Sequence, residues 1–255
     1  MPILNRQSQK RHPFKKIMQT QTRATTTQRI QHYLVRANLD LLLDYTSVIE
    51  KTVATFIVSL GDLPPGFADD ALYSYQVPML SDDGSCSLIE ELAPQPYDLT
   101  AILGGRNETN KRKLLLLNQL VEHSTQLTGA DWLGIYQVRQ NMLANPVLVK
   151  LAYRGRPSRA EFPLSAEFAK GSTNSAVGLS GHAKVIDDVA AFTAEGGGFY
   201  VCDDAVQAEA CLPIFDEAGK IIGIIDAEAA PKAFFNADRL SVLVAVALVA
   251  PALLP

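Results

Sequence analysis

The residues with the clearest chemical potential lie in the last third of this 255-residue chain. Cys202 follows a glycine-rich stretch and precedes Asp203 and Asp204, and Glu209 comes shortly after them. A thiolate is a nucleophile, but neighbouring negative charge raises the pKa of a thiol. Two interpretations of Cys202 are therefore open: a nucleophile whose reactivity depends on a bound substrate, or a buried and inert thiol.

Two further carboxylates end an apolar, strand-like segment. Asp226 and Glu228 share one strand face with Ile222 and Ile224, because alternate residues of a strand point the same way. A carboxylate at a core is costly unless it gains a partner or a proton. The pattern predicts either solvated carboxylates at the rim of the core, or carboxylates that hold a proton or bind a cationic group.

An aromatic pair precedes these acids in the sequence. Trp132 and Tyr136 point the same way from one strand-like segment, and Gly134 between them leaves a gap on that face. Two interpretations are again open: the wall of a site for an apolar group, or ordinary core aromatics.

The sequence contains no pattern for a metal or a nucleotide. Its four histidines show no metal-ligand spacing, and its three cysteines form no Cys-x-x-Cys pair. Gly61 and the pair Gly104-Gly105 belong to no phosphate-binding loop, because no Lys-Ser/Thr follows them. We expect neither a metal nor a cofactor.

The elements that would position these side chains can be inferred from apolar periodicity. Helical spacing covers Thr109 to Leu127 and Ala237 to Val249, and Asn174 to Ala183 resembles a short helix. Strands are expected at residues 132–138, 147–153, 184–189, 199–201, 210–215 and 220–227. The pattern predicts an α+β fold in which an antiparallel sheet is flanked by helices.

The first part of the chain differs in character. Residues 27–60 have helical spacing and predict one long or two abutting helices, which Gly61 ends. Prolines interrupt residues 61–107, so we expect a linker there, with a short helix near Ser87 to Leu92. The predicted organisation is a basic disordered leader (1–26), a helical extension with a Pro-rich linker (27–107) and a main domain (108–255).

Charge and composition limit the classes of partner. Residues 1–39 hold eight Lys/Arg and no Asp or Glu, so the remainder holds 15 basic and 27 acidic residues, or 8 − 12 = −4 in total. Nucleic-acid binding is not expected, because the rest of the chain is acidic. With no bilayer-length apolar run, no secretory signal and too few cysteines for a disulfide framework, we expect a cytoplasmic protein without a membrane span.

Several of these residues together resemble the GAF-domain free methionine-(R)-sulfoxide reductases. The resemblance covers roughly residues 109–250 and implies a GAF-like sheet. The matching positions are Trp132, Tyr136, Asp188-Val189, Cys202-Asp203, Glu209, Asp226 and Glu228.

The resemblance implies a reaction. Cys202 would attack the sulfur of free methionine sulfoxide and become a sulfenic acid as methionine leaves. Carboxylates would bind the ammonium group of the substrate and share a proton with the sulfoxide oxygen, while aromatic side chains would line the site of the methyl group. These residues are Glu209, Asp226 and Glu228, and Trp132 and Tyr136.

The chain departs from the family in its other cysteines. The family's resolving cysteines precede the Cys-Asp motif, whereas this chain has no cysteine between Trp132 and Cys202. Cys211, Cys86 or a small thiol would then resolve the sulfenic acid, and thioredoxin would supply the electrons in the family manner. The alternative is a non-catalytic GAF sensor or regulatory module for a small ligand, with the N-terminal helices carrying signal. We expect a homodimer.

Overall fold

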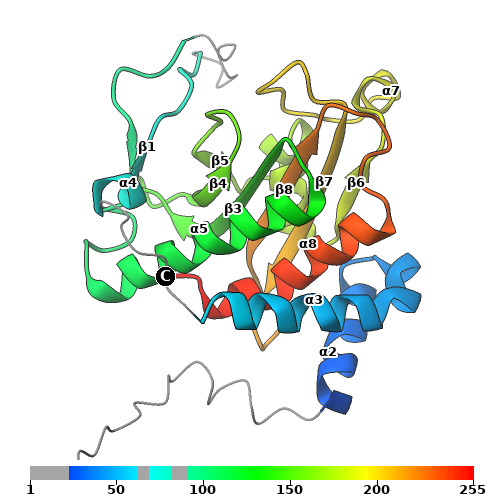
Figure 1. Ribbon diagram of the computed structural model, residues 1–255. Helices are drawn as coiled ribbons and strands as arrows, with labels where there is room; N and C mark the ends of the chain where they lie inside the picture. Colours follow the sequence, from blue (N-terminus) through cyan, green and yellow to red (C-terminus); the bar gives the residue numbers. More distant parts are fainter. Residues whose placement is uncertain (1–22, 62–68, 82–90) are drawn as a thin grey trace, which may run out of the picture.

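The computed structural model describes residues 23–61, 69–81 and 91–255 (Figure 1). Its centre is a six-stranded antiparallel sheet in the order β5-β4-β3-β8-β7-β6. The strands are β3 (Trp132–Gln140), β4 (Pro146–Arg154), β5 (Glu161–Pro163), β6 (Lys184–Ile186), β7 (Ala208–Phe215) and β8 (Ile221–Ala229). This confirms the α+β class and the antiparallel sheet flanked by helices.

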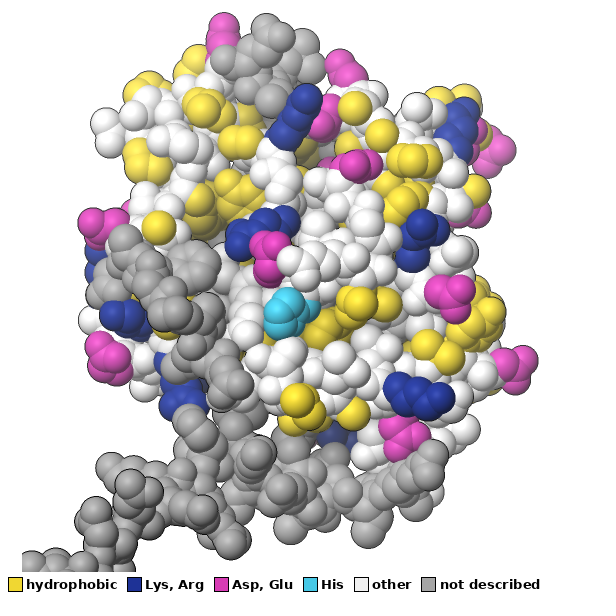
Figure 2. Space-filling model, viewed as in Figure 1, with side chains coloured by type: hydrophobic (Ala, Val, Ile, Leu, Met, Phe, Trp, Pro, Cys, Tyr) yellow, Lys and Arg dark blue, Asp and Glu magenta, His cyan; other side chains and the backbone are white. Residues whose placement is uncertain are grey.

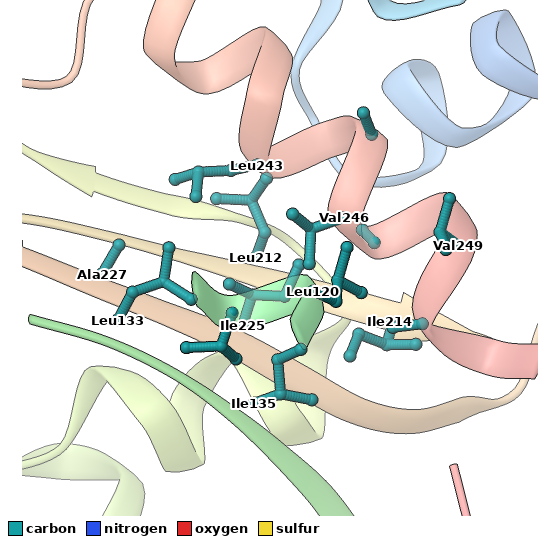
Figure 3. Packing of buried hydrophobic residues seen from close by; sticks show 14 of the residues in the cluster. Leu120, Leu133, Ile135, Leu212, Ile214, Ile225, Ala227, Leu243, Val246 and Val249 are labelled. Atoms are coloured by element: carbon teal, nitrogen blue, oxygen red, sulfur yellow. The ribbon is translucent and has the colours of Figure 1, made fainter. Parts of the chain in front are cut away.

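Two helices, α5 (Glu108–Thr128) and α8 (Ala237–Val249), cover one face of the sheet. Figure 3 shows Leu120 of α5 and Leu243 and Val246 of α8 packed among Leu212 and Ile225 of the sheet. The period-two alternation of the strands sends these apolar side chains to one face and their neighbours to the other. The opposite face is therefore left for side chains of a different kind.

The N-terminal extension is helical, as predicted. It consists of α2 (Arg23–Arg36), a short 3-10 helix η1 (Asp40–Tyr45) and α3 (Thr46–Ser59), and Asn38 separates the first two with a φ of 59°. Helix α3 lies along α8 (Figure 1), and Phe56 is buried in the same core as Leu243. The extension thus forms a third layer behind the helices that cover the sheet.

The segment expected to be a linker contacts the outer edge of the sheet. It contains α4 (Asp69–Tyr73) and a small antiparallel pair, β1 (Ser74–Tyr75) and β2 (Tyr97–Asp98). The Tyr75 hydroxyl donates to the Lys150 carbonyl at 2.7 Å, and the Tyr97 hydroxyl donates to Glu161 Oε1. These contacts tie the segment to β4 and β5.

The short helix expected near Ser87 to Leu92 falls mainly on residues 82–90, which lie outside the described residues. Leu92 itself is not helical: it forms an isolated antiparallel bridge with Pro78.

The strand expected at Phe199 to Val201 is wrong. Residues 195–207 form an irregular loop that follows α7 (Val189–Ala194), a helix that the sequence pattern did not predict. Gly198 approaches the Lys170 carbonyl so closely that an added Cβ would lie 1.8 Å from its oxygen. A tertiary backbone contact, and not strand pairing, therefore holds this segment, and β6 forms the sheet edge beside β7.

No helix among residues 23–61, 69–81 and 91–255 has the length and apolar character needed to cross a bilayer. Helix α8 is apolar because the sheet lies on one side of it and α3 on the other. On the face shown in Figure 2, Lys and Arg side chains are interspersed with Asp and Glu.

The layer formed by α3 predicts a stability effect. Phe56 is 1% exposed, so Phe56→Ala should lower the free energy of unfolding by about 3–5 kcal/mol through the cavity it leaves. Val58 on the same helix is 77% exposed, and Val58→Ala should change stability by less than about 0.5 kcal/mol. Urea unfolding measures both. Equal, small effects would mean that α3 does not share the core.

Candidate functional site

A small chamber lies on the sheet face opposite α5 and α8, beside α6 (Thr173–Ser180) and the loop 195–207. Its free volume is about 10 Å³, the room of a single water molecule. The lining residues are Trp132, Tyr136, Ser158, Phe162, Ser172, Thr173, Asn174, Tyr200, Cys202, Glu209, Asp226 and Glu228. The structure thus brings Cys202 together with both aromatic candidates and all three candidate carboxylates.

Strand register explains why these side chains converge. Glu209 of β7 lies opposite Glu228 of β8, and Trp132 of β3 lies opposite Glu228 on the other side. Asp226 lies opposite Cys211. Directly opposed residues of antiparallel strands point to the same face, so three neighbouring strands contribute to one polar patch.

Helix α6 supplies the hydrogen-bond donors for this patch. It begins after Ser172, whose side chain accepts from the backbone N–H of Ser175. Thr173 Oγ1 donates to Glu209 Oε1, and Asn174 Nδ2 donates to Asp226 Oδ2 at 3.0 Å. The positive end of the helix also favours negative charge here. Sequence reasoning missed both residues, although Ser172-Thr173-Asn174 is a helix-start signal.

Three side-chain oxygens in the chamber lack a hydrogen-bond partner within the described part of the chain. Asn174 Oδ1, Glu209 Oε2 and Asp226 Oδ1 are buried without a hydrogen-bond partner among the described residues. Buried polar atoms in native proteins nearly always have such a partner. Oxygens that converge on one space fit a group with several N–H or O–H donors, such as an ammonium group, and a proton on one carboxyl group lets Glu209 and Asp226 hydrogen-bond to each other.

The two inner carboxyl groups influence each other's ionisation. Burial, and then the neighbouring Asp226, raise the pKa of Glu209 well above its ordinary value. Burial raises the pKa of Asp226 to about 6, against the opposing effect of its hydrogen bond from Asn174. Both groups titrate as a pair. Double ionisation of the pair is therefore disfavoured, and burial favours a proton on Glu209.

Trp132 and Tyr136 do line the chamber, but the gap expected at Gly134 is not open. The indole of Trp132 lies across this glycine, and a Cβ there would be 2.3 Å from its ring. Gly155 approaches the other part of the indole, with an added Cβ at 2.6 Å. Two glycines therefore hold the indole in place, and its Nε1 donates to the Arg156 carbonyl at 3.1 Å.

A buried lysine stands behind this wall. Lys150 is 0% exposed, and its Nζ donates to both the carbonyl and Oγ of Ser158 at 2.7 Å. The ammonium lies 4.1 Å from the ring centre of Tyr153 and lowers the pKa of Asp226. Sequence reasoning missed Lys150, although a lysine inside an otherwise apolar strand segment indicates burial.

Tyr200 closes the chamber from the loop side. Its ring centre lies 5.5 Å from that of Phe162 and 5.7 Å from that of Phe168. Arg159 Nη1 donates to the Tyr200 hydroxyl at 2.8 Å. An amino-acid substrate cannot fit in about 10 Å³, so the walls of the chamber have to move apart for any ligand larger than water.

The cysteines lie in unlike surroundings. Cys202 is half-buried and lines both the chamber and a second, larger pocket. Cys211 is 0% exposed, lies in a cluster of buried apolar side chains, and does not line the chamber. Burial, and then Asp226, raise the pKa of Cys211 well above its ordinary value. Cys86 lies outside the described residues.

Within the described part of the chain, no group of three or more His, Cys, Asp or Glu side chains is arranged to hold a metal ion.

No protein-family model matches the sequence, and no curated protein sequence matches it significantly. One similar solved structure is a type II free methionine-R-sulfoxide reductase from Thermoplasma acidophilum, with 20% identity and a TM-score of 0.49 over 57% of this chain and 95% of that chain. Another is the substrate complex of the Staphylococcus aureus enzyme named fRMsr, with 23% identity and a TM-score of 0.42 over 55% and 84%.

A third is a structure described only as a GAF domain, with 16% identity and a TM-score of 0.41 over 58% of this chain and 92% of that chain. These are the enzyme family and the domain type that the sequence motifs resemble. At such identities and TM-scores neither activity nor residue roles carry over, so the chemistry has to be argued from the contacts of this chain.

The buried pair predicts a pH-dependent stability effect. The folded-state pKa of Asp226, about 6, is higher than its ordinary value of 3.8, so stability is lost as pH rises through this window. Asp226→Asn removes the titration of this carboxyl group and leaves that of Glu209, so the variant should gain about 1–3 kcal/mol relative to the unsubstituted protein between pH 4 and about 6. Denaturant unfolding as a function of pH measures this gain.

Glu217→Gln, at an exposed turn position, is the matched control and should show no such trend. A stability difference for Asp226→Asn that stays constant from pH 4 to 7 would contradict the burial of an ionising carboxyl group.

Proposed function

We propose that this protein reduces free methionine-(R)-sulfoxide to methionine, with Cys202 as the nucleophile. The observation that carries the proposal is the chamber itself, in which a half-buried thiol faces buried carboxyl groups with open acceptor oxygens. A thiol, a proton and a receptor for an ammonium group are the three requirements of this reaction on a free amino acid.

The acceptor oxygens supply the recognition of the amino acid. The open oxygens of Asn174 and Asp226 accept N–H bonds from the substrate ammonium, and ionised Asp226 supplies the opposite charge. Filling these positions removes the cost of leaving buried acceptors unpaired, about 1–3 kcal/mol for each group. Glu228, next to them on the rim, adds a further negative charge.

The shared proton supplies the chemistry. Protonated Glu209 donates a hydrogen bond to the sulfoxide oxygen, which makes the substrate sulfur more electrophilic. The thiol sulfur of Cys202 attacks that sulfur, and the oxygen passes to Cys202. The cysteine sulfur loses two electrons and becomes a sulfenic acid, and the substrate sulfur gains them and leaves as the thioether of methionine.

The enclosure of the chamber by walls on several sides favours a free amino acid over a residue within a polypeptide. Its walls come from the sheet, α6 and the loop 195–207, and Tyr200 closes it against Phe162 and Phe168. The Trp132 and Tyr136 rings provide the apolar surface for the methyl group. A polypeptide would need two openings for its chain.

The chemistry of the reaction indicates its reductant and its cellular compartment. The reductant is a small thiol or thioredoxin, and the reducing cytoplasm is the compartment in which such thiols persist. Residues 108–255 form the unit that carries the site, the described residues 23–61, 69–81 and 91–107 support it, and a homodimer stays a prediction.

One observation favours a second function. Cys211 is completely buried, and no other cysteine among the described residues accompanies Cys202. A chain without a resolving cysteine within reach fits a non-catalytic module that binds a small zwitterion and reports its presence.

The Cys202→Ser variant tests the choice between the two. With dithiothreitol as reductant, the unsubstituted protein should convert free methionine-(R)-sulfoxide to methionine, and the variant should lose at least about a thousandfold of this activity because no nucleophile remains. Amino-acid analysis of the product measures the reaction. Cys211→Ala is the matched control and should keep most of the activity.

Saturable binding of free methionine sulfoxide without turnover, with dithiothreitol or with thioredoxin, would refute catalysis and support the sensor.

The pKa of Asp226 predicts how binding depends on pH. Below pH about 6 Asp226 becomes protonated and loses the charge that attracts the ammonium group. The KM for free methionine-(R)-sulfoxide should therefore rise with falling pH, by up to roughly tenfold per pH unit for a single proton. In Asp226→Asn the KM should be high at every pH. A KM for the unsubstituted protein that is the same at pH 4.5 and pH 7.5 would exclude this role.

A further inference from the structure

We propose that the second pocket beside Cys202 is the binding site of a small zwitterionic thiol, of the amino-acid or short-peptide class, that reduces the oxidised Cys202. This inference rests on the proposed function. The pocket, called the vestibule from here on, is lined by Asp131, Trp132, Gly155, Arg156, Pro157, Ser158, Cys202, Asp203, Ala205, Val206, Glu228 and Ala230.

The vestibule shares a wall with the chamber. Trp132, Ser158, Cys202 and Glu228 line both spaces. The half-buried Cys202 therefore stands on the partition, with the acidic chamber on one side and the vestibule on the other. A thiol bound in the vestibule can approach this sulfur without passing through the chamber.

The two spaces differ greatly in size. The vestibule has a free volume of about 420 Å³, against about 10 Å³ in the chamber. Small-ligand sites typically measure about 300–1,000 Å³, so the vestibule holds a molecule of that class and is too small for a folded protein.

The walls of the vestibule carry charges of both signs. Arg156 lies 3.4 Å from Asp203, and 65% of its side chain is exposed. Asp131 and Asp203 each use one carboxylate oxygen to accept a backbone N–H, from Ala230 and Ala205 respectively. These bonds fix the acidic groups in the wall. A ligand that carries both a carboxylate and an ammonium group complements such a surface.

The thiol that reduces oxidised Cys202 has to come from outside the described part of the chain. Cys211 is fully buried in the middle of β7 and lines neither the chamber nor the vestibule, so its thiol does not meet Cys202 in either space. The chamber, which has to open for the substrate, is lined by buried carboxyl groups, and negative charge disfavours a thiolate there. The vestibule is the open approach to Cys202 among the described residues.

The chemistry takes two equivalents of thiol. The first thiolate attacks the sulfur of the Cys202 sulfenic acid, an S–S bond forms, and the hydroxyl group leaves as water with the proton of the thiol. A second thiolate then attacks the bound thiol's sulfur, which releases the symmetrical disulfide and returns Cys202 to the thiol. Two electrons pass from the two thiols to Cys202.

The test separates the two half-reactions. Protein is first incubated with free methionine-(R)-sulfoxide without reductant until methionine formation is complete, and it is then mixed with glutathione. Quenched samples analysed by mass spectrometry should show one equivalent of methionine, then a Cys202–glutathione disulfide. We expect Ala205→Phe, which fills the vestibule, to slow this second step at least tenfold, and Arg156→Ala to raise the glutathione concentration needed for half-maximal rate severalfold.

The controls isolate the vestibule. Ala218→Phe adds the same ring at an exposed turn outside both spaces and should react with glutathione at the unsubstituted rate. With 2-mercaptoethanol, which has no charged groups, Arg156→Ala should behave like the unsubstituted protein.

Two results would overturn the inference while leaving the proposed function intact: unchanged glutathione rates in both vestibule variants, or reduction of the sulfenic acid by thioredoxin alone. If no methionine forms in the first step, the proposed function itself fails and the vestibule loses its role.

Discussion

The proton shared by Glu209 and Asp226 is the constraint on which this site depends. Two carboxyl groups that are taken out of water next to each other resist ionising together, which favours one proton on the pair. The remaining charge is held by Asn174 and by the first turn of α6, with Lys150 behind it. This arrangement places an acid and an anion within one chamber at neutral pH.

Burying two neighbouring carboxyl groups costs free energy, and the packing of the rest of the fold offsets this cost. The buried carboxyl groups lie on one face of the sheet, while the other face is packed by α5, α8 and, behind α8, by α3. One face therefore provides stability and the other provides chemistry. Tyr75 of β1 and Tyr97 of β2 bond to the strands β4 and β5, and β4 carries Lys150. The N-terminal part of the chain therefore supports both faces of the sheet.

Period-two alternation predicted that Asp226 and Glu228 share one strand face and that Trp132 and Tyr136 share another, whereas their meeting with Glu209 and Cys202 was implied by the family resemblance. Glu209, Asp226 and Glu228 end on one face because their strands are regular and lie in register, and Trp132 joins them for the same reason. The donors that complete the site could not be predicted this way. Thr173 and Asn174 resemble any helix start, and only the packing of α6 on β7 and β8 aims them at the carboxylates.

The strand predicted at Phe199 to Val201 is absent because a tertiary contact overrides the local preference of these residues for a strand. The aromatic and β-branched residues near position 200 favour a strand, but the close approach of Gly198 to the Lys170 carbonyl turns the chain into a loop. The same loop carries Tyr200 and Cys202 to the chamber. The gap expected at Gly134 is filled for a related reason, because the indole of Trp132 folds over the position that lacks a Cβ.

Difference infrared spectroscopy of the protonated-carboxyl region tests the central claim most directly. At pH 7 we expect one buried protonated carboxyl band that disappears in Glu209→Gln and shifts when free methionine-(R)-sulfoxide is added, as the proton turns toward the sulfoxide oxygen. A spectrum with no protonated carboxyl group at pH 7, or a band that neither the substitution nor the ligand changes, would contradict the shared proton and the mechanism built on it.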